Sequence, residues 1–124
     1  MRNWLFGLLI VSSFVQADDA SYIIELKNNT FKPAILIIPA NKKVKIRIIN
    51  FDNEPEEFDS FDLNREKVLF PNKPANIYIG PLAPGEYAYF GEFHPNLAKG
   101  KIVAVSESIA ENKAKKHKGE ADVN

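Results

Sequence analysis

The stretch Lys43-Val44-Lys45-Ile46-Arg47-Ile48 decides the fold class of this chain. It alternates three cations with three aliphatic residues, and a period of two is typical of a β-strand with one buried face. Val44, Ile46 and Ile48 are therefore predicted to point into a core, and the three cations to point into solvent. The chain reads as a β-protein from this point outward.

Further strand patterns flank this stretch on both sides. Short runs rich in aliphatic and aromatic residues lie at 22–26, 35–38, 75–79, 86–90 and 101–105. Six or seven short strands separated by turn signals predict a sandwich or a barrel. Between residues 21 and 105 the only helix expected is a single turn within 62–66.

The N-terminal residues predict export. Met1-Arg2-Asn3 gives a positive start, residues 4–15 are almost wholly apolar, and Val15-Gln16-Ala17 is a suitable cleavage site. This pattern predicts a signal peptide over 1–17 and a periplasmic mature chain without a transmembrane segment. The alternative is a membrane anchor, but the apolar run falls short of the roughly 20 residues that span a bilayer.

Composition narrows the remaining possibilities. The chain has 16 basic and 16 acidic residues, which gives no reason to expect a nucleic-acid partner. It has no cysteine, so it can form neither a disulfide nor a lipid-anchored N-terminus. One domain is predicted over 18–105, followed by a charged tail over 106–124 that is expected to be disordered or weakly helical.

Several segments resemble, in order, those of small cupredoxins. They are Phe31-Lys32-Pro33, the run from Ile37 to Ala40, the run from Val44 to Asn50, the turn and strand at 82–87, and Phe93-His94-Pro95 with the final strand at 100–105. The resemblance implies an all-β fold, a Greek-key β-sandwich of the cupredoxin type.

The resemblance also places the positions of the family's copper ligands. Glu56 follows the stretch from Asn50 to Pro55, where the family has its first histidine, and Gly91 stands where the cysteine would be. His94 matches the second histidine, while Leu97 or Ala98 replaces the methionine. A type 1 copper site needs the thiolate, so no type 1 copper is expected.

A narrower resemblance suggests a role in iron uptake. The segments 55–60, 62–68 and 90–95 resemble cysteine-free periplasmic cupredoxin-like proteins of the EfeO type, which are associated with bacterial iron permeases. In that branch the site is rich in carboxylates. The resemblance implies a metal-binding protein of iron or copper transport.

The predicted metal ligands are Glu56, Glu57, Glu92 and His94, with Asp52 and Asp59 as second choices. Carboxylates with one imidazole suit an Fe or Cu(II) ion. The resemblance places Glu56 and Glu57 side by side at the end of a strand, so they should point to opposite faces and only one should bind directly.

Other interpretations of these residues stay open. The acidic residues at 54–57 can form a solvated loop, residues 64–66 can pair with Glu56 or Glu92 in an ion network without metal, and His94 can bond only to the backbone. Most of six phenylalanines (Phe51, Phe58, Phe61, Phe70, Phe90 and Phe93) are expected in the core, with a few forming a docking patch.

Two functions follow from these residues. The first is a periplasmic metal-binding accessory protein, and the alternative is a metal-free module that docks on a membrane permease or another periplasmic protein. An enzyme such as a ferroxidase is not expected, because oxidation needs an acceptor for the electron and a chain without cysteine has no cysteine-linked copper relay. Elsewhere in the domain there is no nucleophile constellation, phosphate loop or zinc motif.

Overall fold

The alternating stretch forms β4 (Val44–Asn50), which lies inside a sheet between two neighbours. Its burial follows the sequence: Ile46 and Ile48 are fully buried, whereas Arg47 is exposed. Its parallel partner on one side and antiparallel partner on the other satisfy the backbone along both edges. The strand predicted from the period of two is confirmed.

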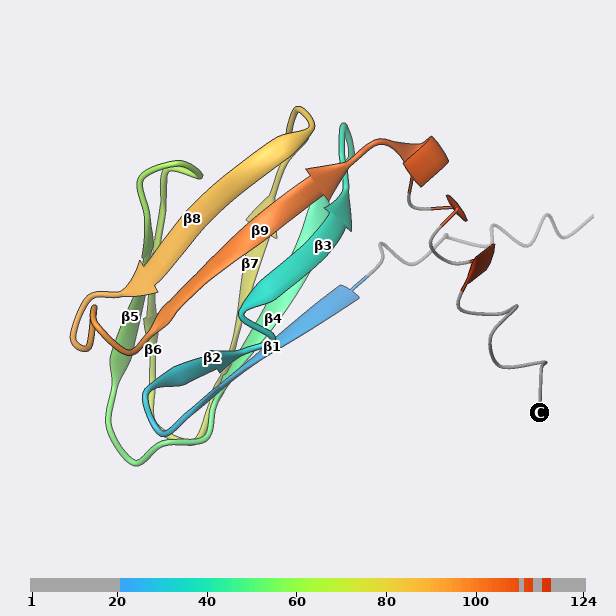
Figure 1. The fold of residues 1–124 in the computed structure, drawn as a ribbon. Coiled ribbons are helices and arrows are strands. Elements are labelled where there is room, and N and C mark those ends of the chain that lie inside the picture. The colour runs from blue at the N-terminus through green and yellow to red at the C-terminus, as the bar shows by residue number, and fades with distance from the viewer. Residues whose placement is uncertain (1–20, 110, 113–114, 117–124) are drawn as a thin grey trace, which may run out of the picture.

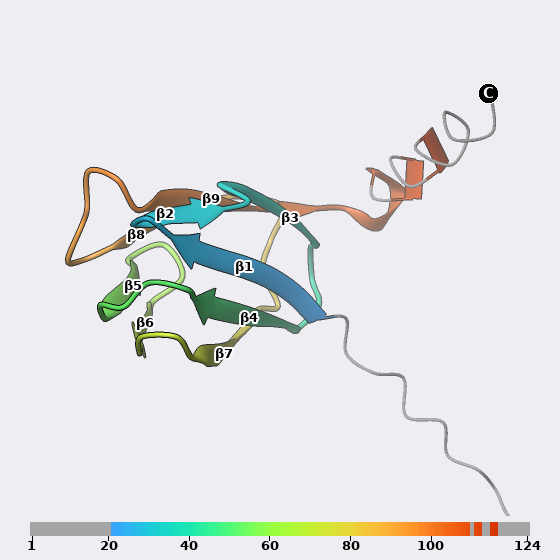
Figure 2. The same ribbon diagram turned by 90° about the horizontal axis from the view of Figure 1, so that it is seen from below.

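The computed structural model describes residues 21–109, 111–112 and 115–116. Within these ranges the other strands are β1 (Ser21–Lys27), β2 (Thr30–Lys32), β3 (Ile35–Pro39), β5 (Glu56–Ser60), β6 (Arg65–Leu69), β7 (Pro74–Ile79), β8 (Gly85–Gly91) and β9 (Lys99–Val105). They form a four-stranded sheet, β2-β1-β4-β7, and a five-stranded sheet, β3-β9-β8-β5-β6. Figures 1 and 2 show the two layers, which confirm the predicted all-β sandwich.

The ends of the chain are described only in part. The predicted signal peptide at 1–17 lies outside the described residues, as does much of the predicted tail. Residues 107–109, 111–112 and 115–116 are helical and exposed. Among the described helical residues, no segment has the length and hydropathy needed to cross a membrane.

The segment between β5 and β6 corrects one prediction. The helical turn expected within 62–66 is wrong: a tight turn over 61–64 leads directly into β6. Asn64 takes a left-handed backbone conformation, with φ at 51°, and its amide donates to Phe61 O. The Leu63 amide donates to Ser60 Oγ, so the side chains close a hairpin here.

The phenylalanines correct a second prediction. Among the six that were expected mostly in the core, only Phe58 is buried. Phe51, Phe70 and Phe93 lie in loops and are about half exposed or more, and Phe61 in the β5–β6 turn is 82% exposed. The alternation that buries one face of a strand does not act on residues outside strands, so these rings remain at the surface.

The part of the core between β2, β5 and β8 is aromatic. Phe31, Phe58 and Tyr89 pack together, with the Tyr89 ring centroid 5.2 Å from that of Phe31 and 4.8 Å from that of Phe58. Tyr89 is buried and its hydroxyl has no hydrogen-bond partner among the described residues. Burial raises the pKa of this hydroxyl well above its usual range. The cluster supports the strand ends that carry the candidate site, because Phe58 follows Glu56 by two residues and Tyr89 precedes Gly91 by two.

Candidate functional site

The loop between β4 and β5 is held by a buried asparagine. The side-chain Nδ2 of Asn50 donates to Glu54 O at 2.8 Å and to Leu69 O at 3.1 Å. The side-chain Oδ1 of Asn50 accepts from the backbone amide of Asp52 at 2.9 Å. Asp52 in turn accepts from the amides of Asn28 and Asn29 in the β1–β2 turn. These hydrogen bonds fix the position at which β5 begins, at Glu56. They also occupy the Asp52 carboxylate with the backbone of the β1–β2 turn.

Glu56 is the most buried carboxylate of the described residues, with 2% of its surface exposed. Its Oε1 accepts hydrogen bonds from the backbone amides of Glu57 and Phe93, both at 2.8 Å. Its Oε2 lies 2.9 Å from His94 Nδ1. The side chain therefore joins the start of β5 to the loop between β8 and β9 and is fully partnered.

His94 lies at the boundary between this interior and solvent, with 29% of its side chain exposed. An ionised Glu56 can only accept, so Nδ1 carries the hydrogen of their bond and Nε2 is the nitrogen that faces outward. Nε2 lies 3.9 Å from Glu54 Oε2. The backbone oxygen of His94 accepts hydrogen bonds from the amides of Leu97 and Ala98, which hold the residue in a tight loop.

Gly91 shows how completely Glu56 fills the space. A Cβ at Gly91 would lie 2.6 Å from Glu56 Cδ and 2.7 Å from both Glu56 Oε2 and Ala98 Cβ. Real side chains do not approach this closely, so no cysteine fits at Gly91 while Glu56 keeps this position. Gly91 stands where the resemblance places the copper-binding cysteine of the family. The Glu56 carboxylate fills the space that a side chain at this position would need.

The four predicted ligands separate into two pairs on opposite faces of the five-stranded sheet. Glu56 and His94 face the interior, whereas Glu57 faces outward, as expected for neighbours in a strand. Glu57 O accepts from the Glu92 amide, and the two carboxyl groups interact on the outer side. Within the described ranges, no three His, Asp or Glu side chains converge in a way that could hold a metal ion.

Glu57 and Glu92, the pair on the outer face of the sheet, repel each other electrostatically. Partial desolvation raises the pKa of Glu57, and the nearby carboxylates of Glu92 and Glu66 raise it further. A weaker contribution with the same sign comes from Asp59. The outer face of β5 and β6 is therefore a cluster of like charges, whereas the inner pair is a satisfied contact.

These contacts bear on the other roles that the sequence left open for Glu56, His94 and Arg65. Glu56 does not belong to a solvated loop, and His94 pairs with a carboxylate and not only with the backbone. Arg65 donates to Tyr78 O and Asn64 O, and among the described residues it forms no ion pair with Glu56 or Glu92.

A type 1 copper ion does not fit this donor set. The chain has no thiolate, the position for one is a glycine, and the space beside it holds the Glu56 carboxylate. The expectation of no type 1 copper thus has a structural counterpart. Binding of another Fe or Cu ion by Glu56, Glu57, Glu92 or His94 remains a prediction.

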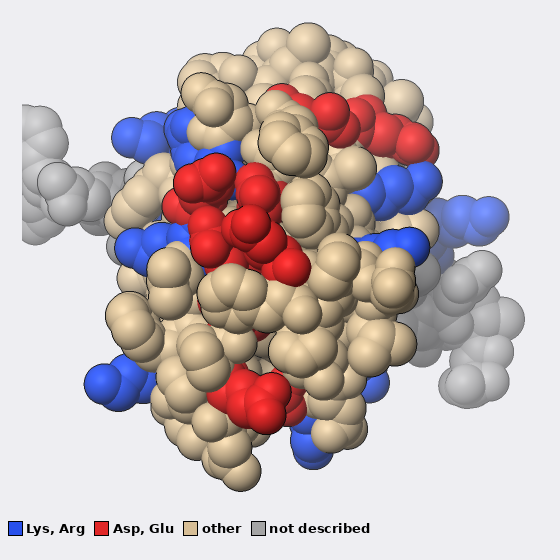
Figure 3. Space-filling model, turned by 90° about the vertical axis from the view of Figure 1, so that its left-hand side faces the viewer, with Lys and Arg blue, Asp and Glu red and all other residues tan. Residues whose placement is uncertain are grey.

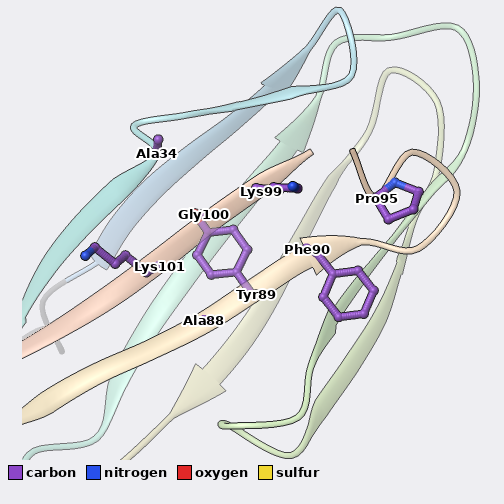
Figure 4. Close-up of a pocket in the computed structure, with 8 residues that line it drawn as sticks. All are labelled: Ala34, Ala88, Tyr89, Phe90, Pro95, Lys99, Gly100 and Lys101. Carbon is purple, nitrogen blue, oxygen red and sulfur yellow. The ribbon is translucent and has the colours of Figure 1, made fainter. Parts of the chain in front are cut away.

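Two features of the outer surface were not apparent from the sequence. A groove of about 610 Å³ runs over β8 and β9 and is lined by Ala34, Ala88, Tyr89, Phe90, Pro95, Lys99, Gly100 and Lys101. Figure 4 shows the Tyr89 ring lying toward Gly100, with Phe90 and Pro95 on the side of the β8–β9 loop. A smaller hollow of about 350 Å³ lies beside it and is lined by Asp59, Ser60, Phe61, Asn64, Arg65 and Glu66.

The end of the molecule that carries the β8–β9 loop is also distinctive in charge. Figure 3 looks onto this end and shows acidic side chains in several separate groups, the largest near the middle of the view. Strand register brings Asp59 of β5 beside Glu66 of β6, and only an alignment of these strands could have revealed this pair.

Comparisons with known proteins agree on the fold. A model of the cupredoxin-like domain matches residues 3–104. A protein of Rickettsia prowazekii, described as uncharacterized, is 42% identical over 80 residues, which is 64% of this chain and 64% of that protein. The chain thus matches about two thirds of the length of this relative.

The chain is similar in fold to several solved structures at low sequence identity. Auracyanin A, a "blue" copper protein of Chloroflexus aurantiacus, has a TM-score of 0.61 at 16% identity, covering 70% of this chain and 99% of that one. A purple cupredoxin of Nitrosopumilus maritimus has a TM-score of 0.54 at 21% identity, covering 68% and 99%. Amicyanin of Paracoccus versutus has a TM-score of 0.55 at 18% identity, covering 74% and 86%.

Proposed function

This chain belongs to the cupredoxin-like domain family, and we propose that it is an exported binding module that works without a metal ion. In this proposal the Glu56–His94 pair replaces the metal of a copper-binding cupredoxin as the tie between β5 and the β8–β9 loop. The domain then offers its surface, and not a redox centre, to a partner. No catalytic step is assigned to it.

One observation carries this proposal. Both oxygens of Glu56 are engaged by partners from the chain itself, two backbone amides and one imidazole, in a space with almost no solvent exposure. A carboxylate with three good partners is already stabilised, so an incoming cation would have to replace those bonds before it gained anything from the oxygens. The same residues that would bind a metal thus stabilise one another.

The proposed location and partner rest on the sequence. A signal peptide at 1–17 supports export to the periplasm, where a membrane permease or another periplasmic protein is the proposed partner. The resemblance to the EfeO-type branch supports an iron permease in particular. The exposed rings of Phe51, Phe70 and Phe93 support a docking role, because such rings are enriched where proteins meet.

The test of metal independence is a titration of the mature protein. We expect no stoichiometric binding of Fe(II), Fe(III), Cu(II) or Zn(II), and no rise in melting temperature when these ions are added, because a ligand stabilises only the state that binds it. Glu25→Gln, on the exposed face of β1, serves as the control variant. Binding of one ion per chain that is lost in His94→Ala would overturn the proposal.

A second candidate is a metal-binding accessory protein of iron or copper transport. The observation in its favour is that His94 Nε2 faces outward within 3.9 Å of a Glu54 oxygen, and that Glu57 and Glu92 form a crowded carboxylate pair nearby. An imidazole with carboxylates suits Fe or Cu(II). In this alternative Glu56 exchanges its amide bonds for the ion.

The same titration separates the two candidates when it includes three variants. Loss of binding in both His94→Ala and Glu56→Gln supports an ion at the inner pair. Loss in Glu92→Gln alone supports an ion at the outer pair with Glu57. Absence of binding in the unaltered protein supports the metal-independent module.

A further inference from the structure

Asp59 occupies an unusual place on the outer face of the five-stranded sheet. Asp59 is only 8% exposed, and its carboxylate forms no hydrogen bond and no ion pair with any described residue. Its oxygens are not fully buried, because the Tyr89 hydroxyl is the only buried side-chain polar atom without a partner among the described residues, and Asp59 lines a hollow that is open to solvent. The carboxylate is therefore available to a group that enters this hollow.

Strand register defines what surrounds Asp59. Its neighbour across to β6 is Glu66, and its neighbour across to β8 is Phe90. On its own strand the residues that share its face are Glu57 and, just past the end of β5, Phe61. Asp59 thus lies at the centre of two acidic and two aromatic side chains.

The carboxylates here have no cation paired with them among the described residues. The ion pairs in these ranges join Lys42 to Glu107, Lys101 to Glu86, and His94 to Glu54 and Glu56, so none involves Asp59, Glu57, Glu66 or Glu92. Arg65 lines the same hollow but donates to the backbone at Tyr78 and Asn64. Among the described residues these carboxylates therefore form no ion pair, and Arg65 is the one cation that lines the hollow with Asp59 and Glu66.

Two aromatic rings lie beside these carboxylates. Phe61 and Phe90 lie with ring centroids 5.8 Å apart, and Phe61 is 82% exposed. A positively charged side chain gains from the face of an aromatic ring as well as from a carboxylate, and the gain is larger where water is excluded. Rings beside a buried carboxylate suit an ammonium or a guanidinium group.

The apolar groove extends the site in one direction. Phe90 lines the groove over β8 and β9 and is also the cross-strand neighbour of Asp59. On the other side of Phe90 its register partner is Lys99. A segment that places a cation over Asp59 can therefore lay an apolar side chain in the groove, and Lys99 opposes a second cation there.

We propose that the outer face around Asp59, with Glu66, Phe61 and Phe90, docks a segment of a partner protein that carries a lysine or arginine beside an apolar residue. Charge complementarity selects this occupant: the carboxylates of Asp59 and Glu66 lie beside two aromatic rings, with an apolar groove alongside. The inference deepens the proposed binding function, on which it rests, by naming the chemistry of the partner.

The test uses the short peptide acetyl-Leu-Lys-Leu-Lys-Leu-amide and the full mature protein, followed by NMR shifts of backbone amides. We expect shifts confined to β5, β6 and the end of β8, and an affinity that falls as salt is added. The matched probe carries acetylated lysines, which keep the shape but lose the charge, and it should not bind.

Variants assign the binding to particular side chains. Asp59→Asn combined with Glu66→Gln should weaken the peptide by about tenfold or more, because a desolvated charge pair is lost, and Phe61→Ala should weaken it severalfold. The control Glu25→Gln lies on the other sheet and should bind normally. Melting temperatures should not fall in the Asp59→Asn variant, which separates lost binding from lost folding.

Two results would overturn the inference: no peptide-dependent shifts on this face, or binding that is unchanged in the Asp59→Asn, Glu66→Gln variant. Either result leaves metal independence intact, because Asp59 does not contact Glu56 or His94. Conversely, a metal bound at the inner pair would contradict the proposed function without altering the expected peptide shifts on the outer face.

Discussion

Glu56 and Asp59 are two buried carboxylates on the same short strand, and they differ in almost everything else. Glu56 faces the interior and has two amides and an imidazole as partners, whereas Asp59 faces outward and has none among the described residues. A buried carboxylate whose partners come from the chain stabilises the fold, whereas the oxygens of Asp59 reach solvent in the hollow that it lines and are free to accept from a group outside the chain. Glu56 thus belongs to the contacts that hold β5 to the β8–β9 loop, whereas Asp59 belongs to the candidate binding face on the outer side of the sheet.

Removal of Glu56 should produce the largest effect. Glu56→Ala leaves two amides and His94 without their acceptor and opens a cavity beside Gly91, so we expect a loss of about 3 to 5 kcal/mol in the free energy of unfolding. Glu56→Gln keeps the shape and one acceptor and should lose less. Urea denaturation measures both, and equal stability of Glu56→Ala and the parent would remove the distinction from Asp59.

Substitution of Asp59 should act in the opposite direction. Asp59→Asn removes a like charge beside Glu57 and Glu66, so we expect a gain of no more than about 0.5 kcal/mol in the free energy of unfolding at neutral pH. The same denaturation experiment tests it, with Glu25→Gln as an exposed control. A clear loss of stability would mean that Asp59 has a structural partner and resembles Glu56 after all.

The smallest effect concerns the titration of Glu57. Its pKa is raised first by partial desolvation and then by Glu92, so Glu92→Gln should lower the pKa of Glu57 toward its ordinary value. A raised pKa means that the folded state holds this proton more tightly, so the associated stability is present at low pH and lost as pH rises through the folded pKa. NMR titration of the Glu57 carboxyl carbon measures the shift, and an unchanged pKa in Glu92→Gln would contradict the pairing.

The sequence predicted the inner pair better than the outer face. The spacing from Asn50 to Pro55 singled out Glu56 and the run Phe93-His94-Pro95 singled out His94, and the two side chains do lie together, while metal binding by them stays a prediction. It could not predict that the Glu56 carboxylate takes two backbone amides, because their directions depend on how the β8–β9 loop closes. The sequence supplied the residues, and loop closure supplied the contacts.

The strands that build the outer face had no readable signal. In β5 the core-facing positions include Glu56 and Ser60, so the alternation of apolar and polar residues is hidden and the segment reads as an acidic loop. Four of the five residues of β6 are exposed, which gives no period either. The cluster around Asp59 depends on the register of these strands with β8, and a single sequence does not encode that register visibly.

The most direct test of the central claim, that Glu56 takes the structural place of a metal, restores the missing ligands. Gly91→Cys alone should be destabilised and bind no copper, because the new Cβ meets Glu56 Cδ. Gly91→Cys with Glu56→His, in a chain that also carries Ala98→Gly to remove the second close contact of the new Cβ, supplies two imidazoles and a thiolate, so we predict one Cu(II) per chain and intense visible absorption from thiolate-to-copper charge transfer. A Gly91→Cys variant that folds normally and binds Cu(II) as well as the triple variant would contradict the claim.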